Sequence, residues 1–157
     1  MTPEIKIIPS KKLLGKRLTM SFSKNTTFRL WSSFMPHRKE ITNAVGTDMF
    51  SLQIYSAGFF SNFNPEAEFE KWALMEVTDF DAIPDGMEAF ILNGGKYAVF
   101  NYKGTAEDAP ETYNYIFREW LPASGYVLDI RPHFEILGEK YTYGDPDSEE
   151  EIWIPVK

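Results

Sequence analysis

Two segments of the chain carry hydrophobic residues at the three- and four-residue spacing of an amphipathic helix. The first, residues 23–41, offers Asn25 as a helix cap and continues with Phe28, Trp31, Phe34 and Met35. The second, residues 107–126, begins after the favourable cap Asp108, and its periodic positions are Tyr113, Ile116, Phe117, Trp120 and Leu121. Because proline interrupts helical hydrogen bonding, we expect this second helix to end at Pro122.

Hydrophobic runs on either side of both segments predict β-strands, one before each helix and two after it. The six predicted strands cover residues 16–22, 49–56, 71–80, 96–104, 133–137 and 150–157. The same element order therefore occurs twice, and "FMP" at 34–36 is echoed by "WLP" at 120–122. We expect an α+β fold: duplicated strand–helix–strand–strand modules, an antiparallel sheet with the helices on one face, and a ligand groove between the halves. Residues 1–157 are expected to form a single domain, with pseudo-repeat halves of about 1–80 and 87–157.

Alternation along the predicted strands divides their side chains between two faces of the sheet. The purely aliphatic and phenylalanine rows, for example Phe50, Leu52 and Ile54, are expected beneath the helices. The opposite rows are unusual for a solvent-exposed face, because they mix aromatic with polar and acidic residues: Gln53, Tyr55, Trp72, Glu76, His133, Glu135, Glu151 and Trp153. This mixture is typical of a small-molecule groove. A half-exposed sheet face with incidental aromatics, or a dimer interface, fits it equally well. Trp120 is mainly a packing residue and also a candidate groove contact.

Composition narrows the possible partners and sites. The net charge of −7 argues against binding to nucleic acid or to anionic membranes, which attract basic surfaces. The absence of cysteine excludes disulfides, thiolate metal sites and thiol nucleophiles. His37 and His133 match no zinc-binding spacing, so we expect neither a metal ion nor a cofactor. The N-terminal residues contain no apolar run typical of a signal peptide or membrane span, so a cytoplasmic protein is expected, either monomeric or homodimeric.

Glu135 is the most unusual candidate, because it interrupts the apolar strand "HFEIL" at 133–137. An ionised carboxylate among aromatic side chains can pair with a cationic ligand, and the aromatic rings add cation–π attraction. A desolvated carboxyl has a raised pKa and can instead act as a general acid or base. The sequence leaves both uses open.

Four segments in the second half together carry a family resemblance: "GGKYAVFNYKG", "YNYIFREWLPASGY", "RPHFEIL" and "DPDSEEEIWIPVK". In their order and spacing, over residues 94–157, they resemble the gyrase-inhibitor-like family, which also supplies the effector-binding domains of AraC-type and MerR-type bacterial transcription regulators. The resemblance implies two modules related by a pseudo-twofold axis, with Glu135 as the pocket carboxylate that meets ligands, often hydrophobic cations. Members commonly have tyrosine two residues after this glutamate. Here that residue is Leu137, so another tyrosine (Tyr55, Tyr97 or Tyr141) would have to supply the hydroxyl.

The expected function is small-molecule binding by a stand-alone effector-binding module that senses or sequesters amphipathic xenobiotics, either cationic or planar aromatic. The related regulators also carry a DNA-binding domain, for which this chain has neither the length nor the basic charge. Some stand-alone members resemble hydrolases of cyclopropane-containing DNA alkylators, and in that alternative Glu135 is catalytic while Tyr55, Trp72 and Trp153 hold the substrate. A third alternative is a protein-interaction module whose partner is DNA gyrase.

Overall fold

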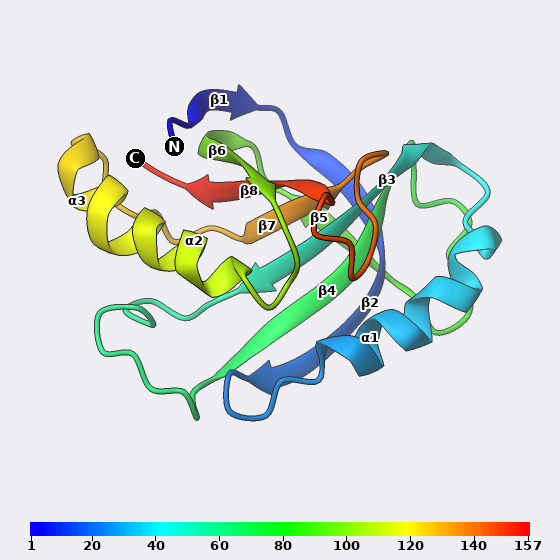
Figure 1. Cartoon of the computed structure of the whole chain (residues 1–157). Helices are drawn as coiled ribbons and strands as arrows, with labels where there is room; N and C mark the ends of the chain where they lie inside the picture. The colour runs from blue at the N-terminus through cyan, green and yellow to red at the C-terminus, as the bar shows by residue number, and fades with distance from the viewer.

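The computed structural model describes residues 1–157, which form eight β-strands and two helical segments (Figure 1). The strands are β1 (Glu4–Ile8), β2 (Lys11–Ser21), β3 (Ala44–Ile54), β4 (Glu68–Val77), β5 (Glu88–Leu92), β6 (Gly95–Lys103), β7 (His133–Leu137) and β8 (Glu149–Pro155). The first helical segment joins α1 (Thr27–Phe34) to the 3₁₀ helix η1 (Met35–Glu40). The second joins α2 (Ala109–Tyr115), the π-helical turn η2 (Ile116–Trp120) and α3 (Leu121–Ser124). The predicted α+β class is confirmed.

All eight strands belong to one antiparallel sheet, in the order β1-β6-β8-β7-β3-β4-β2-β5. Strands β3, β4 and β2 come from the first half of the chain, and β6, β8 and β7 from the second. The halves meet where β3 pairs with β7, which we call the central seam; there Ser51 lies opposite Glu135. The predicted duplication is therefore visible as a sheet whose two halves repeat the same strand–helix–strand–strand order.

Two short strands that the hydrophobic pattern did not reveal join the halves. β1 precedes β2 in the chain but pairs with β6 of the second half. Conversely, β5 precedes β6 but pairs with β2 of the first half. Each half thus contributes an edge strand to the other half, so each edge of the sheet is formed by a strand from the opposite half of the chain.

Both helical segments cover the same face of the sheet, which we call the helix face (Figure 1). On that face α1 packs over Ala73, Met75 and Val77, and the second helical segment packs over Ala98, Phe100, Ile152 and Ile154. The opposite face, the far face, carries a separate buried core that contains Leu52, Trp72, Phe134 and Trp153. The expected face assignment is correct for β4 and β8 and wrong for β3 and β7. In the two seam strands, the Phe and aliphatic rows point to the far face and the polar rows to the helix face.

The second helical segment continues past the point where the sequence predicted that it would end. Pro122 does not end the second segment, because it occupies the first turn of α3, where its missing N–H is tolerated. The segment ends at Gly125, whose φ of 80° is the left-handed conformation that glycine adopts readily. In both halves the helix type changes at the echoed tripeptide, from α1 to η1 after Phe34 and from η2 to α3 after Trp120.

Candidate functional site

Glu135 lies at the central seam on the helix face, between the two helical segments. It is flanked by Ser51 on β3 and by Ile152 on β8. The α1 core covers β4 on one side, and the core of the second helical segment covers β8 on the other. The strip of sheet between these cores therefore carries the polar side chains of the seam strands.

Two side chains donate hydrogen bonds to Oε1 of Glu135. The hydroxyl of Tyr113, on α2, lies 2.9 Å away, and Nε2 of Gln53, on β3, lies 3.5 Å away. Burial raises the pKa of Glu135, while Lys71 and these two hydrogen bonds oppose the rise because they favour the charged form. Glu135 is half-buried, not fully buried, at the central seam.

Two further ionisable side chains stand on the same face. Lys71, on β4, pairs across the sheet with Gln53, and its ammonium donates to Oγ1 of Thr27 at 3.2 Å. Burial lowers the pKa of Lys71, and Glu135 and Glu150 partly offset this effect. Glu150, on β8, has a pKa raised to about 7, first by burial and then by repulsion from Glu135. The floor of the site thus combines one cation with two carboxyl groups.

Aromatic rings form the end of the site near the start of β7. His133 packs edge-on against Tyr55 at 5.0 Å between ring centroids, and Phe60 lies 5.6 Å from it. Phe60 also stacks on Phe117 at 4.8 Å, so the loop between β3 and β4 contacts the second helical segment directly. Burial lowers the pKa of His133 to about 3, which keeps the imidazole neutral at physiological pH.

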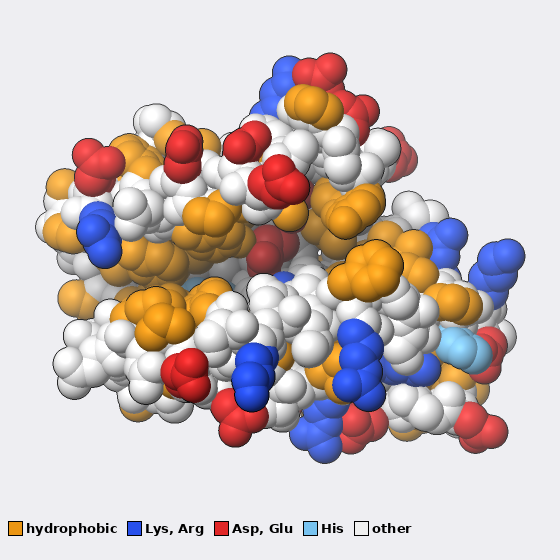
Figure 2. Space-filling model, turned by 60° about the horizontal axis from the view of Figure 1, so that its bottom comes forward, with side chains coloured by type: hydrophobic (Ala, Val, Ile, Leu, Met, Phe, Trp, Pro, Cys, Tyr) orange, Lys and Arg blue, Asp and Glu red, His pale blue; other side chains and the backbone are white.

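Figure 2 shows this side of the molecule as a hollow with hydrophobic side chains along its walls and an acidic side chain at its floor. Apolar walls around a few placed polar groups are the usual construction of a small-molecule site. The model of one family, the GyrI-like small molecule binding domain, matches residues 1–157. The chain belongs to the GyrI-like family.

Relatives of this GyrI-like chain include bacterial transcription regulators. It is 28% identical over 149 residues to the transcriptional regulator BrlR of Pseudomonas aeruginosa, an alignment that covers 94% of this chain and 53% of that protein. The chain thus spans about half the length of this curated relative. Among solved structures, the C-terminal domain of EcmrR superposes with a TM-score of 0.73 at 17% identity, covering 99% of this chain and 97% of that one. The structure of SAV2435 bound to tetraphenylphosphonium superposes with a TM-score of 0.68 at 17% identity, covering 100% and 94%. At such identities the structural likeness shows the fold alone.

The structure brings only some of the predicted site residues together in the GyrI-like groove. Glu135, Tyr55 and His133 share it, as alternation along β7 and β3 predicted. Trp120 belongs to the core beneath the second helical segment, where it packs against Phe100 and Tyr126.

The remaining four predicted residues lie on the far face. Trp72 and Trp153 are buried there, with 4% and 6% of their surface exposed. Glu76 pairs with Lys11, and Glu151 accepts a hydrogen bond from the Trp153 indole. The expectation that these four share a face with Glu135 is wrong. Strands β4 and β8 alternate in the opposite sense from β3 and β7, and a pattern read one strand at a time cannot reveal this relative phase.

Sequence reasoning missed the groove positions of Tyr113, Lys71 and Glu150. The helical spacing predicts Tyr113 on the core-facing side of its helix, and its ring does pack against that core. Its hydroxyl, and not that of Tyr55, Tyr97 or Tyr141, donates to Glu135. Tyr97 lies in the far-face core and donates to the carbonyl of Pro132. The sequence does contain one indication that Lys71 lies in the groove. Lys71 alternates with the buried residues Ala73 and Met75, and a lysine in such a row must meet an acceptor or a ligand.

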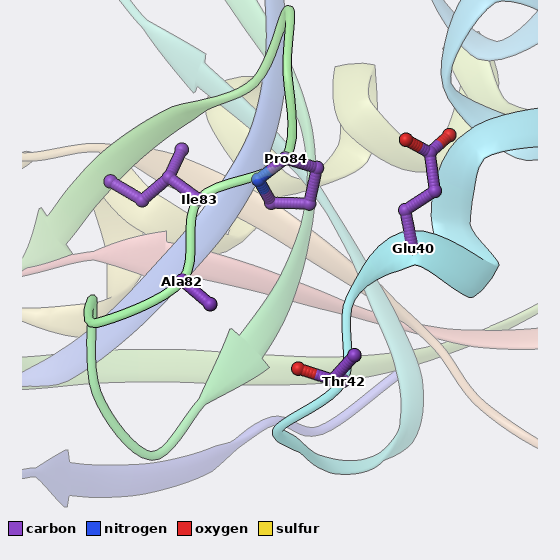
Figure 3. A pocket seen from close by; sticks show the side chains of 5 residues that line it. All are labelled: Glu40, Thr42, Ala82, Ile83 and Pro84. Atoms are coloured by element: carbon purple, nitrogen blue, oxygen red, sulfur yellow. The ribbon is translucent and has the colours of Figure 1, made fainter.

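Two pockets lie outside this charged floor. One of about 270 Å³ is formed by Glu40, the last residue of η1, by Thr42 just after it, and by residues 82–84 of the connector between β4 and β5 (Figure 3). The other, of about 250 Å³, lies between the loop at 55–61 and residues 128–131, and it shares Tyr55, Phe60 and His133 with the aromatic end of the groove. The second pocket therefore extends the candidate site, whereas the first is separate from it. No helix of the protein is long and apolar enough to cross a membrane.

Proposed function

We propose that this GyrI-like domain binds amphipathic aromatic molecules that carry a cationic group, and that it senses or sequesters such xenobiotics. The observation that carries the proposal is Glu135, a carboxylate held by Tyr113 and Gln53 on the floor of a groove with aromatic rings at one end. A cation at this position would replace solvent around a partly desolvated carboxylate, and aromatic faces nearby would add cation–π attraction. Tetraphenylphosphonium, the molecule bound to SAV2435, belongs to this chemical class.

The proposal also assigns the roles of the groove residues. Glu135 is the anionic anchor, Tyr113 and Gln53 position it, and Tyr55, His133 and Phe60 form the apolar wall. Because burial keeps His133 neutral, this wall does not repel a cation at physiological pH. The far-face residues Trp72 and Trp153 serve packing alone.

Calorimetric titration with tetraphenylphosphonium tests the proposal. We expect saturable binding to the wild-type protein and an affinity at least about tenfold lower for Glu135→Gln, which keeps the shape of the side chain but removes its charge. Glu76→Gln is the matched control, since Glu76 is a half-buried glutamate on the far face of the same sheet. Absence of binding to the wild type, or equal losses in the two variants, would refute the proposal.

Hydrolysis of an electrophilic ligand is the second candidate function. It is favoured by two carboxyl groups with raised pKa values, Glu135 and Glu150, on one groove floor. Catalytic amounts of protein incubated with a cyclopropane-containing alkylator would then release many equivalents of ring-opened product. Protection only at stoichiometric amounts, with no product, would reject hydrolysis and leave binding in place.

A further inference from the structure

Lys71 is a groove cation whose hydrogen-bonding capacity is only partly used. Its ammonium donates one hydrogen bond to a side chain, to Oγ1 of Thr27 at 3.2 Å. It makes no salt bridge, although Glu135 and Glu150 are close enough to influence its charge. An ammonium has three N–H donors. Two of them are therefore left for water or for an acceptor on a ligand.

Lys71 and Glu135 stand on opposite sides of β3. Gln53 of β3 lies opposite Lys71 of β4, and Ser51, two residues earlier in β3 and on the same face, lies opposite Glu135 of β7. Two strand spacings across the sheet and two residues along it therefore separate the bases of the two charged side chains, which places them about 12 Å apart. Both side chains point to the helix face, so the groove floor has a positive pole and a negative pole.

Each pole is held by a hydroxyl from a different helical segment. Thr27 lies seven positions before Phe34, and Tyr113 lies seven positions before Trp120, so the two hydroxyls occupy corresponding places in the two halves. Thr27 accepts a hydrogen bond from Lys71, and Tyr113 donates one to Glu135. The duplicated fold thus supplies an acceptor to the cation and a donor to the carboxylate.

Resting on the function proposed above, we infer that the preferred ligands are zwitterionic aromatic molecules, whose cationic end meets Glu135 and whose carboxylate or other anionic end meets Lys71. A ligand with only a positive charge would bring that charge into the field of Lys71, and like charges in a partly buried site repel strongly. A zwitterion satisfies both poles and uses the free donors of the ammonium.

Rhodamine B and its methyl ester form a matched pair of probes for this inference. Both carry the same cationic xanthene ring, but only rhodamine B has a free carboxylate at neutral pH. By calorimetry, we expect the wild-type protein to bind rhodamine B about tenfold more tightly than the ester. Lys71→Met should remove or reverse this preference, because rhodamine B loses its partner while the ester no longer meets a like charge.

Two further variants control the experiment. Lys11→Met removes a lysine from the far face and should leave the preference unchanged. Lys71→Gln keeps a polar side chain and should still abolish the preference, which separates loss of charge from a packing defect. The inference is overturned if the wild type binds the ester as tightly as rhodamine B, or if Lys71→Met changes both affinities equally. In that event binding of the ester still supports the proposed function, whereas failure of both dyes to bind overturns the function and this inference together.

Discussion

The hydroxyl of Tyr113 donates a hydrogen bond of 2.9 Å to Oε1 of Glu135 and so ties the second helical segment to the central seam of the sheet. Tyr113 and Glu135 come from the same half of the chain, but Glu135 pairs in the sheet with Ser51 of the other half. Burial of Glu135 favours its protonated form, and the hydrogen bond from Tyr113 favours the ionised form. The balance between these two effects determines the fraction of Glu135 that is ionised, and so able to bind a cation, at a given pH.

Removing this hydroxyl should weaken cation binding without opening the groove. In Tyr113→Phe the pKa of Glu135 rises further, and we expect the affinity for tetraphenylphosphonium near neutral pH to fall about three- to tenfold. Calorimetric titrations at a series of pH values from neutral downwards should show the acidic loss of binding shifted to higher pH in Tyr113→Phe. Tyr115→Phe, on the same helix with its hydroxyl on the carbonyl of Met1, is the control. A pH profile that is the same for all three proteins would contradict this role of Tyr113.

Glu150 should make the protein less stable as the pH rises. Its pKa is about 7 in the folded protein, against 4.5 for the free side chain, so the folded state keeps a proton that the unfolded state has already lost between these values. The contribution of this group to stability therefore falls as the pH increases through that window. Glutamine does not titrate, so Glu150→Gln should be more stable than the wild type by about 1–3 kcal/mol at pH 8 and should lose this advantage near pH 5.

Urea unfolding at the two pH values measures this difference. Glu149→Gln is the neighbouring control, because Glu149 is hydrogen-bonded to Asn101 and its pKa is lowered instead of raised. A Glu150→Gln variant whose advantage does not grow with pH would show that the carboxyl is not destabilised by its surroundings.

Much of the architecture was predictable because it depends on local patterns. The helical spacing around Ile116 and the alternation in 133–137 identify their elements, and the repeated element order identifies the duplication. The exchanged strands β1 and β5 were missed, since a five-residue edge strand with exposed residues such as Ile7 and Ile91 carries little pattern. Strands β1 and β5 form because the outer edges of β6 and β2 carry unpaired backbone N–H and C=O groups. These groups pair with the extended segment that lies beside them.

The residues of the candidate site were predictable only where the alternation within a single strand determines which face a side chain occupies. Alternation within β7 correctly placed Glu135 and His133 on one face. It could not show that Trp153, on the different strand β8, belongs to the far face. Both faces of the central strands are buried, so hydrophobicity alone does not distinguish the side beneath the helices from the side opposite. The contact with Tyr113 depends on how the second helical segment lies on the sheet, which is set by tertiary packing.

The far-face tryptophans should therefore affect stability and not binding. Trp153 stacks on Phe134 at 5.1 Å within the buried core. Trp153→Ala should lower the free energy of unfolding by about 3–5 kcal/mol. Under conditions where the variant is folded, we expect its affinity for tetraphenylphosphonium to stay within about twofold of the wild type, because the ring does not reach the groove. A large loss of affinity with an intact fold would place Trp153 back in the ligand site.

The exchange of β1 and β5 should make the two halves unfold together. Leu92, in β5, is fully buried in the far-face core, where residues of both halves meet. Leu92→Ala removes apolar contacts from that shared core and should cost about 2–5 kcal/mol. Amide hydrogen exchange followed at increasing urea concentration, in β4 for the first half and in β8 for the second, reports on each half separately within one and the same protein. Since each half lends a strand to the other, we expect both strands to give the same free energy of opening, and Leu92→Ala to lower both values equally. Different values for the two strands would show that the halves are independent units, in spite of the continuous sheet that joins them.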